Sequence, residues 1–305
     1  MGAGEVDDLH SAAWFGAYRD FWWNADHLEL CARRLRFDEV GSVLDVGSGV
    51  GHWGMLLAHV LPGDARVTGV DREPAWTEEA TRRAAAGGLA DRFGYMTGEA
   101  EALPFEDDSF DLVTCQTLLV HVADVVRAVR EMMRVTRPGG LVLASEPNNQ
   151  VATLVTSSTT AGAPVEEMLD LTRFYLTCER GHAALGRGHA SAGDLVPGAF
   201  ADAGLTGIEA WLSDKVGLML PPYATEEQQA LKAQFEQDAE RGAWGWTHAE
   251  ARRCWIAGGG AEDEFEASWE RRMAESRRDV DAIDDGTFRW PGGDILYLVA
   301  GRKPL

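Results

Sequence analysis

Cysteines are few in this sequence, and they lie far apart. Its 305 residues include only Cys31, Cys115, Cys178 and Cys254, and no two of them form a C-x-x-C pair. This spacing excludes the usual zinc-ribbon and thiol-redox motifs. Unpaired thiols are typical of the reducing cytoplasm, so we expect a cytoplasmic protein with four free thiols.

Apolar runs long enough to cross a membrane are also missing. None approaches the roughly 20 residues that a transmembrane helix needs. Residues 1–8 are acidic and lack the basic and apolar regions of a signal peptide. Val6 stands where an N-myristoylation motif has serine or threonine. We therefore expect neither a membrane span nor a lipid anchor.

Positive charge is scarce. Lysine and arginine number 28 against 49 aspartates and glutamates, which gives a formal net charge of −21. Proteins bind the phosphates of nucleic acids through lysine and arginine, so this balance argues against a nucleic-acid partner. Such acidity commonly serves solubility, and it also suits a cationic ligand.

The sequence does contain a glycine-rich segment that follows a short apolar run. Residues 42–46 read as a strand, Gly47, Gly49 and Gly51 as a tight turn, and residues 52–61 as a helix. Glycines let the backbone approach a ligand, and the helix N-terminus presents free N–H groups. His52 replaces the third glycine of the dinucleotide motif G-x-G-x-x-G. The alternative is an ordinary strand-to-helix turn.

Further apolar segments alternate with helical patterns, and Arg137–Gly140 carries helix-stop signals. We expect more strands at residues 66–70, 93–96, 107–115, 141–145, 205–212 and 295–301. This alternation predicts a doubly wound parallel sheet with its ligand at the carboxyl ends of the strands. Asp71 follows the second strand, about 20 residues past the glycine turn, where a ribose-binding carboxylate belongs.

Five motifs in order resemble the class I S-adenosylmethionine-dependent methyltransferases, in particular the ubiquinone/menaquinone-biosynthesis-like (methyltransferase type 11) subgroup. They are Asp45-x-Gly47-x-Gly49-x-Gly51, Asp71, Gly98-Glu99-Ala100 with Leu103-Pro104-Phe105, Phe110-Asp111-Leu112-Val113, and Arg137-Pro138-Gly139-Gly140. The resemblance covers about residues 40–149. It implies an α/β, Rossmann-like fold in which a doubly wound, seven-stranded sheet has its last strand antiparallel.

The resemblance also implies the cofactor S-adenosyl-L-methionine, with S-adenosyl-L-homocysteine as the product. Asp71 would hold the ribose hydroxyls, Trp76 would pack on the adenine, and Glu99 would replace the usual aspartate that faces the adenine amino group. Gln116 and Thr117 would lie under the sulfonium arm. The full set implied for cofactor binding is Tyr18, Asp45, Gly47, Ser48, Gly49, Asp71, Arg72, Trp76, Gly98, Glu99, Ala100, Gln116 and Thr117.

Segments outside residues 40–149 are expected to serve the acceptor. We predict a helical lid at 1–39, a helical insertion with the sixth strand at 150–222, a cap of three helices at 223–285, and the last strand within 286–305. The lid is rich in aromatic residues, namely Trp14, Phe15, Tyr18, Phe21, Trp22 and Trp23. Trp22, Trp23 and Tyr175 are predicted to bind the acceptor; the alternative for the lid is a helix packed on the core edge. The cap tryptophans Trp244, Trp246, Trp255 and Trp269 would pack on the core or roof a pocket.

Two titratable residues follow central strands and are candidates for catalysis and acceptor binding. His121 is a candidate general base because histidine titrates near neutral pH; the alternative is a residue of the pocket floor. Glu146 would bind a cationic acceptor or act as the base; the alternative is a solvated loop carboxylate. His182 and His189 have no other ligands at a recognisable spacing, so we expect no metal.

These features predict a methyltransferase that acts on an oxygen or nitrogen of a small-molecule acceptor. Two alternatives stay open: a peptide or protein methyltransferase, and a protein that binds S-adenosylmethionine without transferring its methyl group. The sequence does not distinguish a monomer from a homodimer.

Overall fold

The computed structural model describes residues 16–242, 246–292 and 295–305 of the chain. Contacts divide the chain into two compact units. We call residues 23–148, 188–214 and 295–305 the sheet unit, and residues 1–22, 149–187 and 215–294 the helical unit. The predicted lid and the predicted 150–222 segment therefore each contribute to both units. Among the described helices, none has the length and apolar content to cross a membrane.

One seven-stranded sheet is present in the described part of the sheet unit, in the order β3-β2-β1-β4-β5-β7-β6. The strands are β1 Ser42–Val46, β2 Arg66–Asp71, β3 Phe93–Thr97, β4 Phe110–Gln116, β5 Thr136–Pro147, β6 Thr206–Leu212 and β7 Leu296–Arg302. Strands β1 to β5 pair in parallel, whereas β7 runs antiparallel to both β5 and β6. This topology confirms the predicted α/β doubly wound sheet with an antiparallel last strand.

The start of β5 differs from the prediction. Arg137–Gly140 was expected to end a helix, but that helix (α4, Val125–Val135) ends earlier and these residues already belong to β5. Thr136 pairs with Phe110, and the register then shifts before Leu112 pairs with Leu141. Gly139 has a φ of 74°. The irregular pairing lets a segment with strong helix-stop residues enter the sheet.

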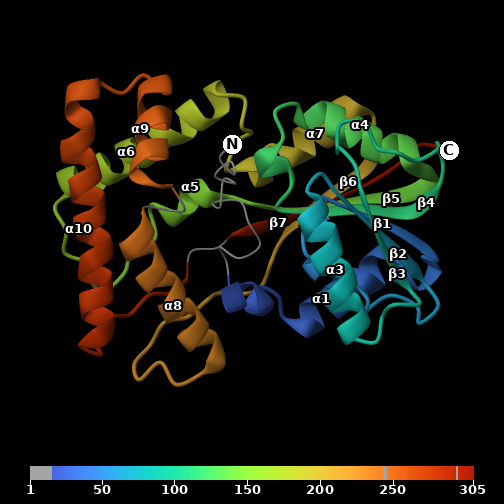
Figure 1. Ribbon diagram of the computed structural model, residues 1–305, viewed down its shortest axis with the longest axis horizontal. Coiled ribbons are helices and arrows are strands. Elements are labelled where there is room, and N and C mark those ends of the chain that lie inside the picture. Colours follow the sequence, from blue (N-terminus) through green and yellow to red (C-terminus); the bar gives the residue numbers. More distant parts are fainter. Residues whose placement is uncertain (1–15, 243–245, 293–294) are drawn as a thin grey trace, which may run out of the picture. The chain divides into compact units, whose positions relative to one another are not determined.

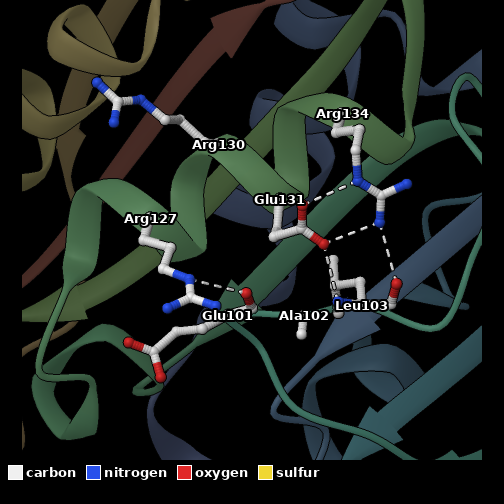
Figure 2. A pocket seen from close by; sticks show the side chains of 7 residues that line it. All are labelled: Glu101, Ala102, Leu103, Arg127, Arg130, Glu131 and Arg134. Carbon is white, nitrogen blue, oxygen red and sulfur yellow. Dashed lines mark hydrogen bonds and ion pairs between the residues drawn. The ribbon is translucent and has the colours of Figure 1, made fainter.

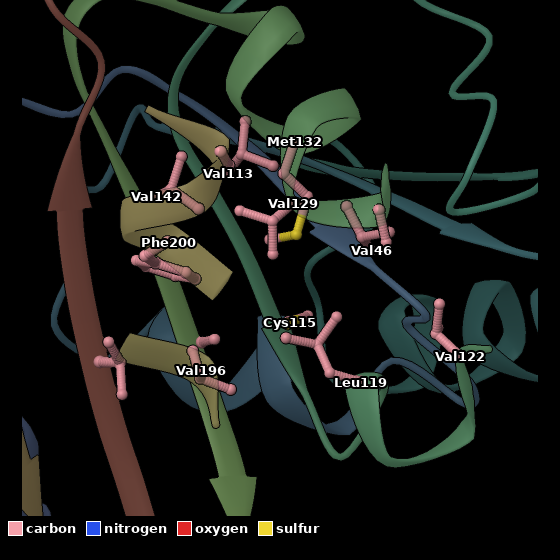
Figure 3. Packing of buried hydrophobic residues seen from close by; sticks show 14 of the residues in the cluster. Val46, Val113, Cys115, Leu119, Val122, Val129, Met132, Val142, Val196 and Phe200 are labelled. Carbon is pink, nitrogen blue, oxygen red and sulfur yellow. The ribbon is translucent and has the colours of Figure 1, made fainter. Parts of the chain in front are cut away.

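Helices cover both faces of the sheet, with α4 and α7 on one face and α1 and α3 on the other (Figure 1). The α-helices of this unit are α1 Ala25–Leu35, α2 His52–Leu57, α3 Pro74–Ala86, α4 and α7 Val196–Ala203, and the 3-10 turns are η3 Phe37–Glu39, η4 Leu119–His121 and η5 Ala192–Asp194. Helix α2 is shorter than predicted. Figure 3 shows Met132 of α4 and Phe200 of α7 packed with strand residues such as Val113 in a fully buried core. This core fixes the strand ends that carry the site.

The helical unit comprises η2 Gly16–Phe21, α5 Asn149–Ala152, α6 Val165–Ala184, α8 Glu226–Arg241, α9 His248–Ala257, η6 Glu262–Glu264 and α10 Phe265–Asp284. Helices α8, α9 and α10 lie within residues 223–285, the segment predicted to form a cap of three helices. Trp246, Trp255 and Trp269 are buried with Phe174 and Phe265 in one aromatic core, so they pack the helices together. Trp14, Phe15 and Trp244 lie outside the described residues.

Candidate cofactor-binding site

The turn after β1 depends on its glycines. Gly47, Gly49 and Gly51 have φ values of 67°, 51° and 83°, a region that residues with a Cβ rarely adopt. A Cβ on Gly47 would lie 2.6 Å from Leu118 Cδ1, whereas no described atom lies within 4 Å of the Cβ position at Gly49. The turn therefore leaves open space for a ligand directly beside Gly49.

Asp71 ends β2 and connects that strand to the glycine turn. Its Oδ2 accepts a hydrogen bond from Gly49 N (2.8 Å), and its Oδ1 accepts one from Glu73 N (3.0 Å). The side chain is buried, and this burial raises the pKa of Asp71, while the two N–H donors partly offset the rise. A carboxylate has further lone pairs after these two bonds, so it can still accept from a diol. The structure thus brings Asp71 to the turn as predicted.

Asp45 contacts the protein itself. The carboxylate is 1% exposed, and its Oδ2 accepts a hydrogen bond from Gly54 N (3.0 Å) in the first turn of α2. Asp45 thereby joins the end of β1 to the beginning of α2. This contact gives Asp45 a role in shaping the glycine turn, in addition to the cofactor contact that the sequence predicted.

Buried polar atoms without partners gather at the carboxyl ends of the central strands. Gln116, the last residue of β4, is 2% exposed, and neither atom of its amide has a hydrogen-bond partner within the described residues. The same is true of the hydroxyls of Ser48, in the glycine turn, and Ser145, near the end of β5. Such groups are costly to bury unless a ligand or water satisfies them. Gln116 and Ser48 were predicted to bind the cofactor.

The loop after β3 lies next to Asp71, because Gly98 N donates to the Asp71 carbonyl (2.9 Å). This loop carries Glu99, which is exposed, and Ala100, which is half-buried. On the neighbouring helix α3, Trp76 is also half-buried, and Arg72 is exposed beside Glu73. The structure therefore brings these predicted adenine and ribose residues to the same edge of the sheet.

Helix α4 anchors the continuation of this loop. Figure 2 shows the residues that line a pocket between them, in which Glu131 Oε2 accepts from Leu103 N (2.9 Å) and Arg134 Nη2 donates to Leu103 O (3.0 Å). Arg127 Nε donates to Glu101 O (3.2 Å). None of the predicted cofactor residues lines this pocket. Its ion pairs hold the Leu103-Pro104-Phe105 motif in place, which gives that motif a structural role.

The turn after β4 carries the candidate base. Thr117 has a φ of 50°, and its N–H donates to Ser145 O (2.9 Å) on β5. His121 ends the short 3-10 turn η4 and is exposed. The side chain is thus accessible to a substrate, as a general base must be.

Glu146 is more enclosed than the sequence suggested. The side chain is 0% exposed, so the alternative of a solvated loop carboxylate is wrong. Its Oε1 accepts from Leu118 N and Leu119 N (both 2.9 Å), and its Oε2 accepts from Val120 N (3.3 Å). Burial raises the pKa of Glu146 to about 7 against the opposing effect of these donors. A fully enclosed carboxylate that accepts backbone hydrogen bonds favours a structural role for Glu146, while catalysis and acceptor binding by this residue stay predictions.

The residues predicted to bind the acceptor are buried in separate units. Trp23, of the sheet unit, packs against Trp53 with ring centroids 5.3 Å apart. Trp22 is a buried residue of the helical unit, as is Tyr18, which was predicted to bind the cofactor. Tyr175 is 3% exposed in the aromatic core of that unit, where it stacks on Trp246 at 6.0 Å. This packing gives Tyr175 a role in the core of the helical unit, and acceptor binding by Tyr175 stays a prediction.

Tyr95 is a residue of the site that sequence reasoning missed. It lies on β3 opposite Gly69 of β2, and a Cβ at Gly69 or at Gly51 would overlap its ring or hydroxyl. Burial raises the pKa of this hydroxyl, which has no hydrogen-bond partner within the described residues. The signal was Gly69 itself, because a glycine inside a strand often marks a close approach. As for metals, the described residues contain no group of three or more potential ligands.

Comparison with known proteins agrees with this geometry. Residues 44–144 match the Methyltransf_11 methyltransferase domain model. The chain is 32% identical over 114 residues to the ubiquinone/menaquinone biosynthesis C-methyltransferase UbiE of Geotalea daltonii, and 41% identical over 104 residues to UbiE of Paracoccus denitrificans. These alignments cover 37% and 34% of this chain, and 48% and 41% of the relatives. The chain thus spans less than half the length of these curated relatives.

A solved structure extends the likeness beyond the aligned segment. The fold is similar to that of the crystal structure of the YcgJ protein from Bacillus subtilis, with a TM-score of 0.51 and 21% sequence identity. The match covers 92% of this chain and 100% of that chain. At this identity the likeness shows the fold alone.

Proposed function

Through residues 44–144 the chain belongs to the class I S-adenosylmethionine-dependent methyltransferases, and on this premise we propose that it methylates an oxygen or nitrogen of a small-molecule acceptor. When bound, S-adenosylmethionine supplies an electrophilic methyl group. The named relatives are C-methyltransferases, so an acceptor screen also needs carbon nucleophiles.

One observation carries the proposal. The buried amide of Gln116, at the end of β4, has no hydrogen-bond partner within the described residues, and it lies at the carboxyl ends of the strands, where the glycine turn also lies. Gln116 satisfies neither of its polar groups within the described residues, and the space beside Gly49 is open. A polar ligand is the simplest way to satisfy such an amide. The site therefore fits a cofactor that combines charged, hydroxylated and apolar parts.

Each residue has a distinct task in this proposal. Asp71 accepts hydrogen bonds from the ribose, Trp76 and Ala100 border the adenine, and Gln116 binds the polar methionine end. His121 holds or removes the proton of the acceptor. In-line transfer requires the acceptor to be aligned and water to be excluded, and Trp23 of the sheet unit is proposed for this task.

The direct test is calorimetric titration of the purified chain with S-adenosylhomocysteine, repeated with NAD as a control. We expect binding of S-adenosylhomocysteine alone. Acceptor-dependent release of S-adenosylhomocysteine from S-adenosylmethionine, measured across a panel of small hydroxyl, amine and carbon acceptors, then identifies the substrate class. Turnover only with peptides would establish the protein methyltransferase. Tight binding without turnover on any acceptor would establish a binding protein.

Replacing Asp71 by alanine is expected to weaken S-adenosylhomocysteine binding by about 1–3 kcal/mol, or roughly 5- to 150-fold in Kd, because charged hydrogen bonds to the ribose are lost. The exposed Asp91 of the same unit offers the control Asp91→Ala, which should leave Kd unchanged. A thermal melt separates this loss from unfolding, since Asp71 also binds Gly49 N. Unchanged affinity in Asp71→Ala would remove this residue from the site.

Replacing His121 by alanine is expected to lower turnover about 100-fold or more, a typical contribution of general acid–base catalysis. The Kd for S-adenosylhomocysteine should stay within about twofold, because His121 is not among the residues proposed to hold the cofactor. His59, which is exposed after α2, provides the matched control His59→Ala. If His121→Ala turns over like the unchanged protein, His121 is a pocket wall and not a base.

A further inference from the structure

The carboxylate of Glu146 supplies acceptors for backbone N–H groups at the start of η4. The first N–H groups of any helical turn lack partners within that turn. Here Leu118 N, Leu119 N and Val120 N all donate to Glu146, at 2.9, 2.9 and 3.3 Å. Gln116 pairs with Ser145 at the end of the β4–β5 ladder, so Glu146 projects from the next position toward the turn. One side chain thus satisfies the whole beginning of η4.

The conformation of this turn needs an anchor. Thr117, which precedes these three donors, is β-branched and has a φ of 50°. Residues of this kind adopt the left-handed region only where their surroundings hold them there. The Glu146 hydrogen bonds follow directly after the strained residue, and Thr117 N donates to Ser145 O on the same strand as Glu146. The end of β5 therefore fixes both sides of the bend.

The anchored turn contacts the glycine turn. The side chain of Leu118 lies against Gly47, so close that a Cβ on Gly47 would be 2.6 Å from its Cδ1 and 3.1 Å from its Cβ. Gly47 N in turn donates to Val70 O (2.8 Å), next to Asp71. The turn also begins after Gln116 and ends at His121. A shift of Leu118 would therefore reach the glycine turn on one side, and a shift of η4 would displace His121 on the other.

We infer that Glu146 is a positioning residue of the cofactor site, which acts through Leu118 on the glycine turn without touching the ligand. This inference rests on the proposed function. It assigns a buried acidic residue an indirect influence on the affinity for S-adenosylmethionine and its product. It also explains why a carboxylate without access to solvent lies at the edge of the sheet where the ligand is proposed to bind.

Two conservative variants distinguish the effect of the length of the Glu146 side chain from the effect of its charge. Glu146→Gln keeps the length of the side chain and an oxygen acceptor for the turn, whereas Glu146→Asp keeps the charge but is one methylene shorter. We expect Glu146→Asp to weaken S-adenosylhomocysteine binding about fivefold or more, while Glu146→Gln stays within about threefold of the unchanged protein. The exposed Glu209 on β6 provides the control Glu209→Asp, which should bind normally. Calorimetry gives Kd, and a thermal melt reports folding.

A double-mutant cycle tests the route through Leu118. If Glu146 acts through this residue, Glu146→Asp combined with Leu118→Ala should bind no more weakly than the weaker single variant. Additive losses, or a Kd unchanged in Glu146→Asp, would overturn the inference. Equal losses in the Asp and Gln variants, in step with lower melting temperatures, would also overturn it and leave a general stability role. If the unchanged protein does not bind S-adenosylhomocysteine, the proposed function fails first and the inference fails with it.

Discussion

Replacing Gly181 by alanine is expected to lower the free energy of unfolding of the helical unit by about 4 kcal/mol or more. Gly181 lies in α6, where a Cβ would overlap the carbonyl oxygen of Cys254 on α9 and would lie 2.8 Å from Gly258 N. Alanine otherwise favours a helix over glycine by about 1 kcal/mol, so the two effects oppose each other. The steric overlap outweighs the gain in helix propensity, because the added Cβ would meet backbone atoms of α9 and of the residue after it, which cannot rotate away as a side chain can.

Helices α6 and α9 approach each other closely at a second glycine, which supports the same prediction. A Cβ on Gly258 would overlap the carbonyl oxygen of Thr177 in α6. Gly162, in the loop before α6, is the matched control, because nothing described lies within 4 Å of its Cβ position. Urea unfolding followed by tryptophan fluorescence reports on this unit through Trp255 and Trp269, together with the tryptophans of the sheet unit. A midpoint in Gly181→Ala equal to that of Gly162→Ala would show that α6 and α9 separate without cost.

Glu179 is expected to make the protein less stable as pH rises. The carboxyl group of Glu179 is buried in α6, as are Cys178 and His182. Burial raises the pKa of Glu179 from 4.5 to about 7, and a hydrogen bond with Tyr175 opposes part of this rise. Below pH 4.5 the group is protonated in both the folded and the unfolded state, so stability is fully present. Between pH 4.5 and 7 only the unfolded state ionises. The shift corresponds to a loss of about 3 kcal/mol, complete above pH 7.

Glu179→Gln should remove this loss, because an amide does not titrate. The free energy of unfolding is measured with urea from pH 4 to pH 8 in both proteins. We expect its decrease over this range to be about 3 kcal/mol smaller in Glu179→Gln than in the unchanged protein. Asp279 and Glu146 also have pKa values raised by burial, so a residual slope of the same sign should persist in the variant. Glu166→Gln, at an exposed position of α6, should keep the full slope. Identical pH slopes in Glu179→Gln and the unchanged protein would contradict the prediction.

The sheet was largely predictable because its central strands are buried on both faces and therefore appear as apolar runs. Residues 42–46 form β1 as predicted, and β7 was placed within one residue at each end. The start of β5 was not predictable, because proline and glycine in Arg137–Gly140 are local stop signals. Pairing on both sides places this segment in the sheet: Phe110 and Leu112 of β4 pair with the residues that flank it, and Gly139 N donates to Lys303 O (2.9 Å) just after β7. Contacts between residues far apart in the chain override the local propensity there.

The site was predictable where backbone geometry defines it, and less so where burial decides the role. The glycine turn and Asp71 follow from spacing, and the structure joins them by a hydrogen bond. Glu146 shows the limit: its donors are N–H groups 26 to 28 residues earlier, which no local pattern reveals. Tyr175 shows the same limit, since an aromatic residue on a helix fits a pocket or a core equally well until its neighbours are known.

The position of β7 has a consequence for how the chain is made. This strand lies between β5 and β6, although it is the last of the seven to leave the ribosome. Among the described strands, β6 pairs with β7 alone, so it stays unpaired while the residues between them, including α8, α9 and α10, are synthesised. At about 5–20 residues per second, that wait lasts several seconds or more. During synthesis the open edges of β5 and β6 are therefore the points at which a chaperone would protect this chain from aggregation.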